Sequence, residues 1–181
     1  MESAAALARH AGARVIGTVR SPAEEPAART AGAHEVVLNT LGLVTGVKAL
    51  APDVVDHIVE VTFGANIDAD VEVLKIGGSI GAYATDTATP KIPFWPMVFK
   101  NIRVFFLGSD DFPTEAKVAA TRDLNNALQS GWPRFEIAES IPLAEIARAH
   151  ELVEHPARRG RVVVTVGEET FAAGALGFSQ E

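Results

Sequence analysis

Short apolar segments alternate with amphipathic segments along most of this chain. Apolar, β-branched runs predict strands at residues 14–19, 35–38, 54–61, 79–84, 103–107, 135–141 and 161–166. The segments between them have helical spacing and predict helices at residues 2–11, 21–31, 43–50, 66–76, 113–130 and 143–155. Strands that alternate with helices indicate βαβ units, and such units build a mostly parallel sheet. The pattern therefore predicts an α/β fold.

Local signals place the ends of two helices. Ser21, Pro22 and Glu24 are typical of a helix start, with serine as the N-cap, proline at the first helical position and glutamate at the third. The pair Gly77-Gly78 is expected to end the helix that precedes it.

Composition bounds the class of protein. The chain has 181 residues, 48% apolar and 22% charged, as in an ordinary globular protein, and we expect one partial domain at 1–166 and a C-terminal tail at 167–181. The net charge of −7 disfavours binding to nucleic acid, and the lack of cysteine excludes disulfides, thiol catalysis and thiolate zinc sites. No apolar run approaches the ~20 residues that span a bilayer, and no signal-peptide pattern is seen. We therefore expect a cytoplasmic protein with no membrane partner.

A glycine-rich phosphate loop is missing from this pattern. Nucleotide-binding α/β domains open on a buried strand, a G-x-G-x-x-G turn and a helix that holds the pyrophosphate. Here residues 2–11 already read as that helix. We expect a Rossmann-like, doubly wound parallel sheet that is truncated, with the strands at 14–19 and 54–61 on either side of a vacant central position. Because unpaired backbone is costly there, either the two strands close up, another segment fills the position, or the sequence is a fragment of a longer polypeptide, and we adopt the last interpretation.

Several short strings, taken in order, resemble one protein family. They are Ala11-Gly12-Ala13-Arg14-Val15-Ile16-Gly17-Thr18, Ala31-Gly32-Ala33, Gly77-Gly78-Ser79-Ile80-Gly81, Ala149-His150-Glu151 and Arg159-Gly160-Arg161-Val162-Val163. Together they resemble the cofactor-binding part of the medium-chain dehydrogenase/reductase superfamily, and most closely its zinc-free quinone oxidoreductase branch, the zeta-crystallin-like enzymes. The resemblance implies NADPH as the cofactor, a quinone or enone as the substrate, and an N-terminal catalytic domain that these residues do not include.

The end of the strand at 14–19 is a candidate contact for the adenosine ribose. Domains that bind NAD place an acidic residue near this point, where it accepts hydrogen bonds from the ribose hydroxyls. This chain has Val19 and then Arg20, and an arginine favours a 2′-phosphate. Ser21 is expected to cap the next helix and is a second candidate phosphate contact. The alternative is that Arg20 is simply a solvated side chain.

Further cofactor-binding candidates follow the strands at 54–61 and 79–84. Ligands bind beyond the carboxyl ends of parallel strands, which favours Gly64, Gly81, Ala82 and Tyr83. The alternative for the glycines is that turns need their permissive backbone. Phe105 is a candidate for packing against a nicotinamide ring, and a core or interface role is its alternative.

Two other motifs have ordinary explanations. Residues 77–81 match G-x-S-x-G, but a hydrolase needs a strand before the serine and a helix after it, which is the reverse of the order expected here. The run from His150 to His155 has two histidines but neither of the spacings of a zinc-protease helix. We expect a polar helix face there and no metal site.

We interpret the chain as a fragment of an NADPH-dependent oxidoreductase that transfers a hydride to a quinone or an enone. No catalytic acid or base can be named, and we expect the fragment alone to be inactive. A non-catalytic dimerising or nucleotide-sensing Rossmann-like module is an alternative, and a fragment of a zinc-dependent alcohol dehydrogenase is another.

The strand from Arg103 to Leu107 predicts how the chain associates. It is the last strand of the run that begins at residue 54, so it should lie at an edge of the sheet, and it is apolar. We expect a homodimer in which this strand pairs with its own copy. The alternative is that Lys100 and Arg103 keep the edge unpaired.

Overall fold

The computed structural model describes residues 2–40, 42–131, 137–155 and 160–167. Contacts divide the chain into two units, Met1–Pro133 and Arg134–Glu181, and each is described here by itself. The sequence-based boundary at residue 166 stays a prediction, and all but the first residue of the expected tail lie outside the described residues.

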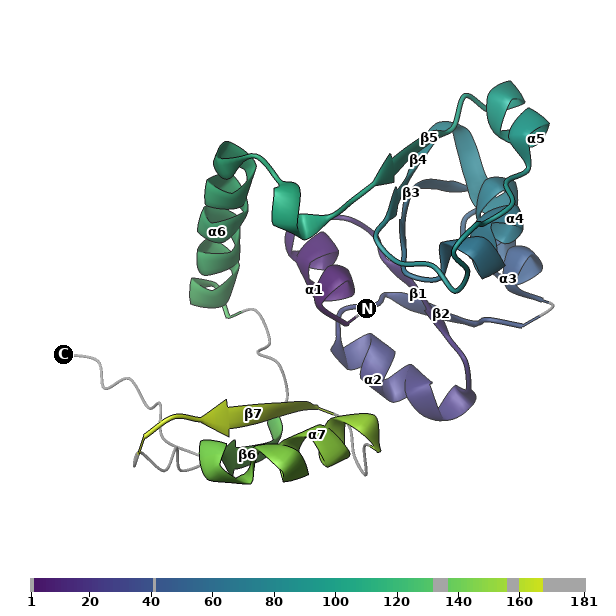
Figure 1. Cartoon of the computed structure of the whole chain (residues 1–181). Coiled ribbons are helices and arrows are strands. Elements are labelled where there is room, and N and C mark those ends of the chain that lie inside the picture. Colours follow the sequence, from purple (N-terminus) through teal and green to yellow (C-terminus); the bar gives the residue numbers. More distant parts are fainter. Residues whose placement is uncertain (1, 41, 132–136, 156–159, 168–181) are drawn as a thin grey trace. The chain divides into compact units, whose positions relative to one another are not determined.

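The first unit alternates helices with strands, as the sequence pattern predicts (Figure 1). Its helices are α1 (Glu2–His10), α2 (Glu25–Thr30), α3 (Leu43–Leu50), α4 (Phe63–Val73), α5 (Phe94–Phe99) and α6 (Thr114–Gln129), with short 3₁₀ turns η1 (Pro22–Glu24) and η2 (Ser109–Asp111). Its strands are β1 (Ile16–Val19), β2 (Glu35–Leu38), β3 (Val55–Glu60), β4 (Leu74–Ala82) and β5 (Arg103–Phe106).

All strand pairs in the described residues are parallel, so the predicted α/β class with a parallel sheet is confirmed. β1 pairs with β2 in one sheet, and β3, β4 and β5 form another in that order, with β5 at an edge. No pairing joins β1 to β3 among the described strands. This break lies where the sequence predicts a vacant strand position.

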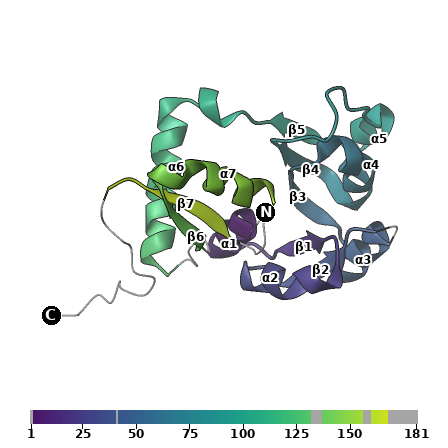
Figure 2. The same cartoon turned by 60° about the horizontal axis from the view of Figure 1, so that its bottom comes forward.

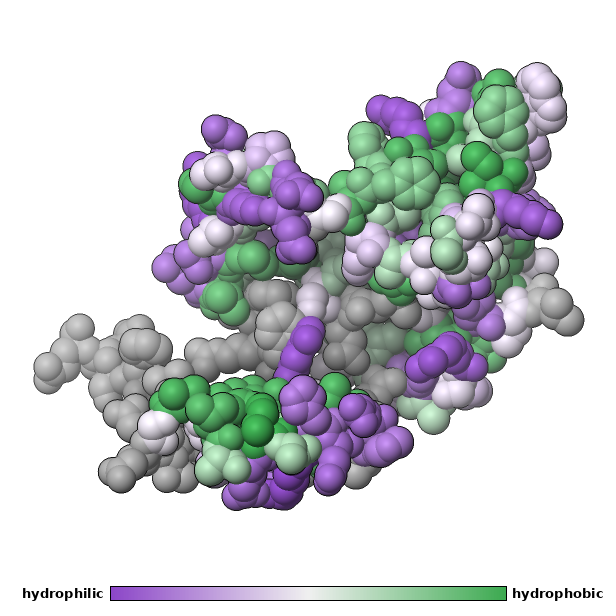
Figure 3. Space-filling view, in the orientation of Figure 1, coloured by the Kyte–Doolittle hydropathy of each residue, from purple (hydrophilic) through white to green (hydrophobic). Residues whose placement is uncertain are grey.

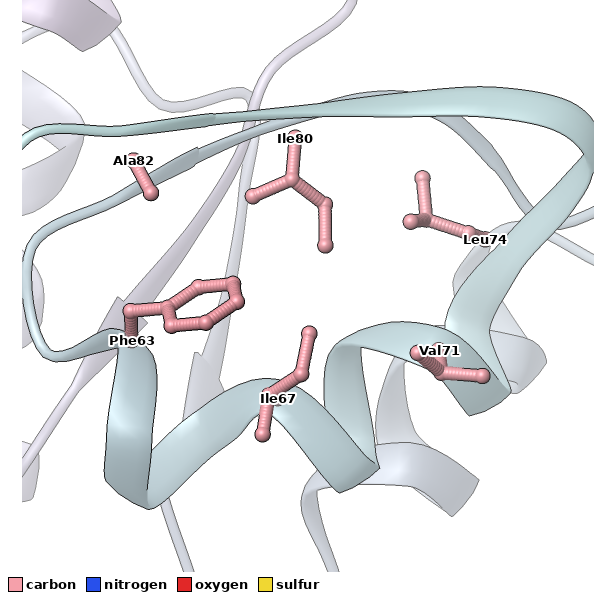
Figure 4. Close-up of a cluster of buried hydrophobic side chains, with 6 residues drawn as sticks. All are labelled: Phe63, Ile67, Val71, Leu74, Ile80 and Ala82. Atoms are coloured by element: carbon pink, nitrogen blue, oxygen red, sulfur yellow. The ribbon is translucent and has the colours of Figure 1, made fainter. Parts of the chain in front are cut away.

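Apolar residues of α4 and β4 form the main core of this unit (Figure 4). Phe63, Ile67 and Val71 lie one helical turn apart on the face of α4 that meets the sheet, and Ile80 and its neighbours point back at them. The complete cluster is Phe63, Ile67, Val71, Leu74, Ile80 and Ala82. Since every second residue of a strand faces the same side, Ile80 and Ala82 fix the side of β4 that α4 covers.

The prediction for Gly77-Gly78 was wrong. We expected these glycines to end a helix at residue 76, but α4 ends at Val73 and β4 already begins at Leu74. Both glycines therefore lie within the strand, where the register against β3 shifts between Val55 and His57. Gly77 has a φ of +73°, and a Cβ on Gly78 would come within 2.9 Å of the Leu74 side chain. The two glycines thus permit an irregular strand.

Lys100, a residue far along the chain, caps the carboxyl end of α4. Lys100 Nζ donates to the carbonyl oxygens of Val71 at 2.6 Å and Leu74 at 2.8 Å, and also reaches that of Glu72 at 3.2 Å. Carbonyls at a helix end lack partners within the helix, so a cation there is favourable. Lys100 follows α5, a short helix that the sequence pattern did not predict.

The second unit is small. Its described elements are β6 (Ile137–Pro142), the 3₁₀ turn η3 (Leu143–Glu145), α7 (Ile146–Glu154) and β7 (Arg161–Thr165), and β6 pairs with β7 in parallel (Figure 2). The expected strands and helix are found here, although residues 135 and 136 of the strand expected at 135–141 lie outside the described residues. Across the described part of the chain, no helix has both the length and the apolar character needed to span a membrane.

Candidate functional site

The carboxyl ends of β3 and β4 are tied together by backbone hydrogen bonds. The Tyr83 N–H donates to the Glu60 carbonyl oxygen at 3.2 Å, and the Phe63 N–H donates to the Ala84 carbonyl oxygen at 3.2 Å. On the other side of β4, the Leu107 N–H donates to the Ala82 carbonyl oxygen at 2.9 Å. Three parallel strands therefore end side by side, which is where α/β sheets bind ligands.

Gly64 lies in the first turn of α4, beneath a polar loop. Its N–H donates to Thr85 Oγ1 at 3.2 Å. A Cβ at this position would lie 2.6 Å from both Asp86 Oδ1 and Thr87 Cγ2. Close approach of the 85–87 loop thus explains glycine at this position without any ligand, and the cofactor-binding role predicted for it stays a prediction.

The structure separates the candidates at the ends of β4 and β5 by the direction in which they face. Ala82 is 3% exposed and packs into the α4 core (Figure 4). Gly81 and Phe105 are register partners, and Phe105 and Tyr83 are 50% and 51% exposed. Gly81, Tyr83 and Phe105 therefore lie near one another at the strand ends, while the Ala82 methyl group is turned away into the core.

The other two candidates follow β1, in the other sheet. The Arg20 side chain is 88% exposed, and its Nη2 lies 3.6 Å from Glu24 Oε1. The Arg20 backbone N–H also donates to Glu24 Oε2 at 2.9 Å. Ser21 takes the N-cap position with extended backbone before Pro22, as predicted, but its side chain makes no capping hydrogen bond, so that part of the expectation was wrong.

Glu24 is a residue whose position the sequence argument missed. It was placed as a helix-start residue, and the end of β1 was read as free of carboxylates. The turn from Arg20 to Glu24 is tight enough to bring this carboxylate back beside the arginine. The signal was present in the sequence as a four-residue spacing of opposite charges.

Two buried acids near the end of β3 were also missed. Glu60 and Asp70 are the buried charged side chains among the described residues, at 6% and 7% exposure. Glu60 accepts hydrogen bonds from the Thr62 N–H and, at 3.2 Å to each carboxylate oxygen, from Asn66 Nδ2. Burial, and then the neighbouring Glu60 carboxylate, raise the pKa of Asp70 to about 8. In the sequence, the one signal for Asp70 is that an acidic residue occupies a helix position that faces the sheet.

The side chains at these strand ends are arranged to bind a ligand rather than to catalyse a reaction. His57 Nδ1 lies 2.8 Å from Ser79 Oγ, and the two residues are register partners on β3 and β4. The two side chains satisfy each other, and Ser79 stands within a strand rather than at a strand-to-helix elbow. Within the described ranges, no group of three or more histidine, aspartate or glutamate side chains could hold a metal ion.

Comparison with known proteins places this geometry in a family. Residues 2–121 match the family described as zinc-binding dehydrogenase. The chain is 25% identical over 161 residues to a quinone oxidoreductase of Pongo abelii, covering 84% of this chain and 47% of that protein. It is also 25% identical over 165 residues to a quinone oxidoreductase of Rattus norvegicus, covering 87% and 49%. The chain thus spans about half the length of these curated relatives.

Solved structures show the same fold. AibC superposes with a TM-score of 0.78 at 26% identity, over 90% of this chain and 45% of that one. An Escherichia coli quinone oxidoreductase complexed with NADPH superposes with a TM-score of 0.73 at 23% identity, over 90% and 52%. The chain belongs to the zinc-binding dehydrogenase family, within the medium-chain dehydrogenase/reductase superfamily, and corresponds to the C-terminal nucleotide-binding part of its members.

Proposed function

We propose that this chain is the cofactor-binding part of an NADPH-dependent oxidoreductase that reduces a quinone or an enone. The observation that carries the proposal is the arrangement of strand ends, with Gly81, Tyr83 and Phe105 together at the ends of β4 and β5 and an exposed arginine at the end of β1. The two curated relatives are quinone oxidoreductases, and one solved relative is complexed with NADPH. The identity to each of these is 25% or less, so substrate and cofactor are part of the proposal.

The described residues fit a phosphorylated dinucleotide. When bound, the nicotinamide supplies the hydride, and the protein has to hold and orient it. Arg20 presents a guanidinium to solvent and would bind a 2′-phosphate through charge-assisted hydrogen bonds. Gly81 lies beneath the side chains of His57 and Leu107, and half of the adjacent Phe105 surface is exposed for packing. Glu24 holds Arg20 in the free chain and competes with the phosphate for it.

We also propose that the protein is a homodimer built on the β5 edge. Successive N–H groups of a strand point to opposite sides, and the Leu107 N–H donates toward β4, so the Val104 and Phe106 N–H groups point outward from the sheet. The cations that could protect this edge are engaged within the chain: Lys100 binds carbonyls of α4, and Arg103 Nη2 donates to the Gly77 carbonyl oxygen at 2.8 Å. An outward row of donors beside apolar side chains favours pairing with another strand.

Calorimetric titration with NADPH and NADH tests the cofactor proposal. Arg20→Ala should weaken NADPH binding by about 10–150-fold, the loss of about 1.5–3 kcal/mol expected for a charged hydrogen bond, and leave NADH binding unchanged. Glu24→Gln is the matched variant. It removes the competing carboxylate and should strengthen NADPH binding by no more than about 5-fold, since exposed ion pairs contribute ~1 kcal/mol or less. Equal losses for both cofactors in Arg20→Ala would refute the 2′-phosphate role.

A further inference from the structure

Two acidic side chains are buried together between β3 and α4. Glu60 is the last residue of β3, and Asp70 lies one turn of α4 beyond Asn66, on the side of the helix that faces the sheet. Each is more than nine-tenths buried. Acidic side chains are almost never buried to this extent unless they are paired or protonated.

The hydrogen bonds around the pair are unequal. Glu60 accepts from the Thr62 N–H and from Asn66 Nδ2, so its carboxylate ties the strand end to the first two turns of α4. Asp70 Oδ2 is buried and has no hydrogen-bond partner among the described residues. Two ionised carboxylates can only accept hydrogen bonds, and nothing would join them. A proton on Asp70 converts it into a donor, for which the Glu60 carboxylate is the neighbouring acceptor.

Cations on the elements around α4 are engaged elsewhere. They are Lys48 of α3, which pairs with Glu72, Lys75 of β4, which pairs with Asp56, and Lys100, which binds carbonyls at the end of α4. On α4 itself, Asp68 is exposed. Glu60, from β3, is the charged group that acts on Asp70, and its effect adds to that of burial. A neutral Asp70 is the state that this environment favours.

We propose that Asp70 is a positioning residue, which holds Glu60 through a shared proton and so keeps the turn between β3 and α4 in shape. With the proton present, Glu60 keeps its bonds to Thr62 and Asn66. Without it, two like charges lie buried side by side, and α4 must move away from the end of β3 to hydrate them. Gly64 lies in the first turn of α4, so its amide is placed to report on this change.

The sign of the pH dependence follows from the direction of the shift. The pKa of Asp70 is raised from 3.8 to about 8, so the folded chain keeps a proton that the unfolded chain releases. The stability that this proton gives is fully present below pH 3.8 and is lost progressively as the pH rises to about 8. Within this window the unfolding constant should rise by up to about tenfold per pH unit because of this one group.

Urea unfolding between pH 6 and pH 9 tests the proposal on the full chain. Asp70→Asn keeps a neutral donor at every pH, so the variant should lose this pH dependence and be the more stable protein at pH 9. Asp68→Asn removes an exposed acid two residues away and should retain the wild-type profile. In wild-type protein, the NMR signals of the Thr62 and Gly64 amides should shift with an inflection near pH 8, and in Asp70→Asn this inflection should be absent. Neither measurement needs a cofactor.

Carbon NMR of the wild-type Asp70 carboxyl gives a direct reading even where the Asp70→Asn variant folds poorly. A carboxyl signal that titrates near pH 8 supports the proposal, and one that titrates near pH 4 overturns it. The same profile for the Asp70→Asn and Asp68→Asn variants would also overturn it. So would a stability above pH 8 that rises on addition of Mg²⁺ or Ca²⁺, because a metal ion would then hold the two carboxylates together.

Discussion

Two regions that adjoin β4 differ in how completely their side chains are packed. Toward α4, Phe63, Ile67 and Ile80 are 2%, 1% and 0% exposed. Toward β5 and α5, large apolar side chains remain in contact with solvent, and a hydrophobic surface lies over this region (Figure 3). Exposed aromatic side chains in this region include Phe94, Trp95, Phe99, Phe105 and Phe106. The first region is a packed core, against which Met97 and Val104 also lie, whereas the exposed aromatic side chains of the second have the composition of a surface that meets a partner.

Stacking makes this contrast sharper. The Trp95 and Phe99 rings of α5 stack with their centroids 5.9 Å apart, and the Phe94 ring meets the Trp95 ring edge-on with a centroid distance of 5.3 Å. The aromatic side chains of α5 thus contact one another, and none of the three is buried. Aromatic residues have the largest apolar surface to gain from burial, so an exposed aromatic group is costly to keep without a function.

The largest expected effect is on stability. Ile80→Ala should lower the free energy of unfolding by about 3 kcal/mol, because it removes a fully buried side chain from a packed cluster. Phe99→Ala removes a larger side chain that is 75% exposed, and should change stability by less than about 0.5 kcal/mol. Urea unfolding of the two variants measures both. Comparable losses of stability in the two variants would mean that the α5 surface is covered within the chain, which would contradict the difference between the two regions.

The next effect is on association. Val104→Pro removes an outward N–H without removing a donor to β4, and should weaken the proposed dimer by at least about tenfold, or ~1.4 kcal/mol. Val104→Ala is the control, since it loses similar packing but keeps the N–H. Sedimentation at micromolar concentration compares the three proteins. A wild-type monomer, or an unchanged dimer in the proline variant, would rule out this interface.

The smallest effect is expected at Ser79, the register partner of His57. Ser79→Ala removes an exposed hydrogen bond to His57 and should change stability by less than about 0.5 kcal/mol. Fluorophosphonate reagents, which label activated serines, should not label the wild-type chain, because Ser79 lies within a strand. Stoichiometric labelling at Ser79 would instead assign a hydrolase-type function to the G-x-S-x-G match.

Periodic features of this fold could be predicted from the sequence, and irregular ones could not. The strands at β2 and β5 and the helix α3 stand out because their apolar spacing is regular. The short helix α5 was missed because proline and aromatic residues dilute any helical period, and its side chains remain exposed. Gly77 and Gly78 carry the usual signal of a helix end, but contacts with β3 and Leu74 make them part of a strand. Tertiary pairing overrides local preference there.

The candidate site divides in the same way. Position relative to a strand end could be read from the sequence, and it placed Gly81, Tyr83 and Phe105 close together. The direction in which a side chain points could not be read from the sequence, and Ala82 faces the core instead. Pairing between side chains was also beyond reach at Asp70, where the sequence offers no sign that the carboxyl lies against Glu60.

The closure of α4 by Lys100 has a consequence for synthesis of the chain. The carbonyl oxygens of Val71 and Leu74 receive their partner 29 and 26 residues later. A ribosome adds roughly 5–20 residues per second, so the end of this helix waits about 1–6 s for its lysine to be made. Once Ala82 has been added, the core of α4 and β4 is complete in sequence, but the last carbonyls of α4 still depend on water. The crossover through α5 is therefore the step that completes α4 on the nascent chain.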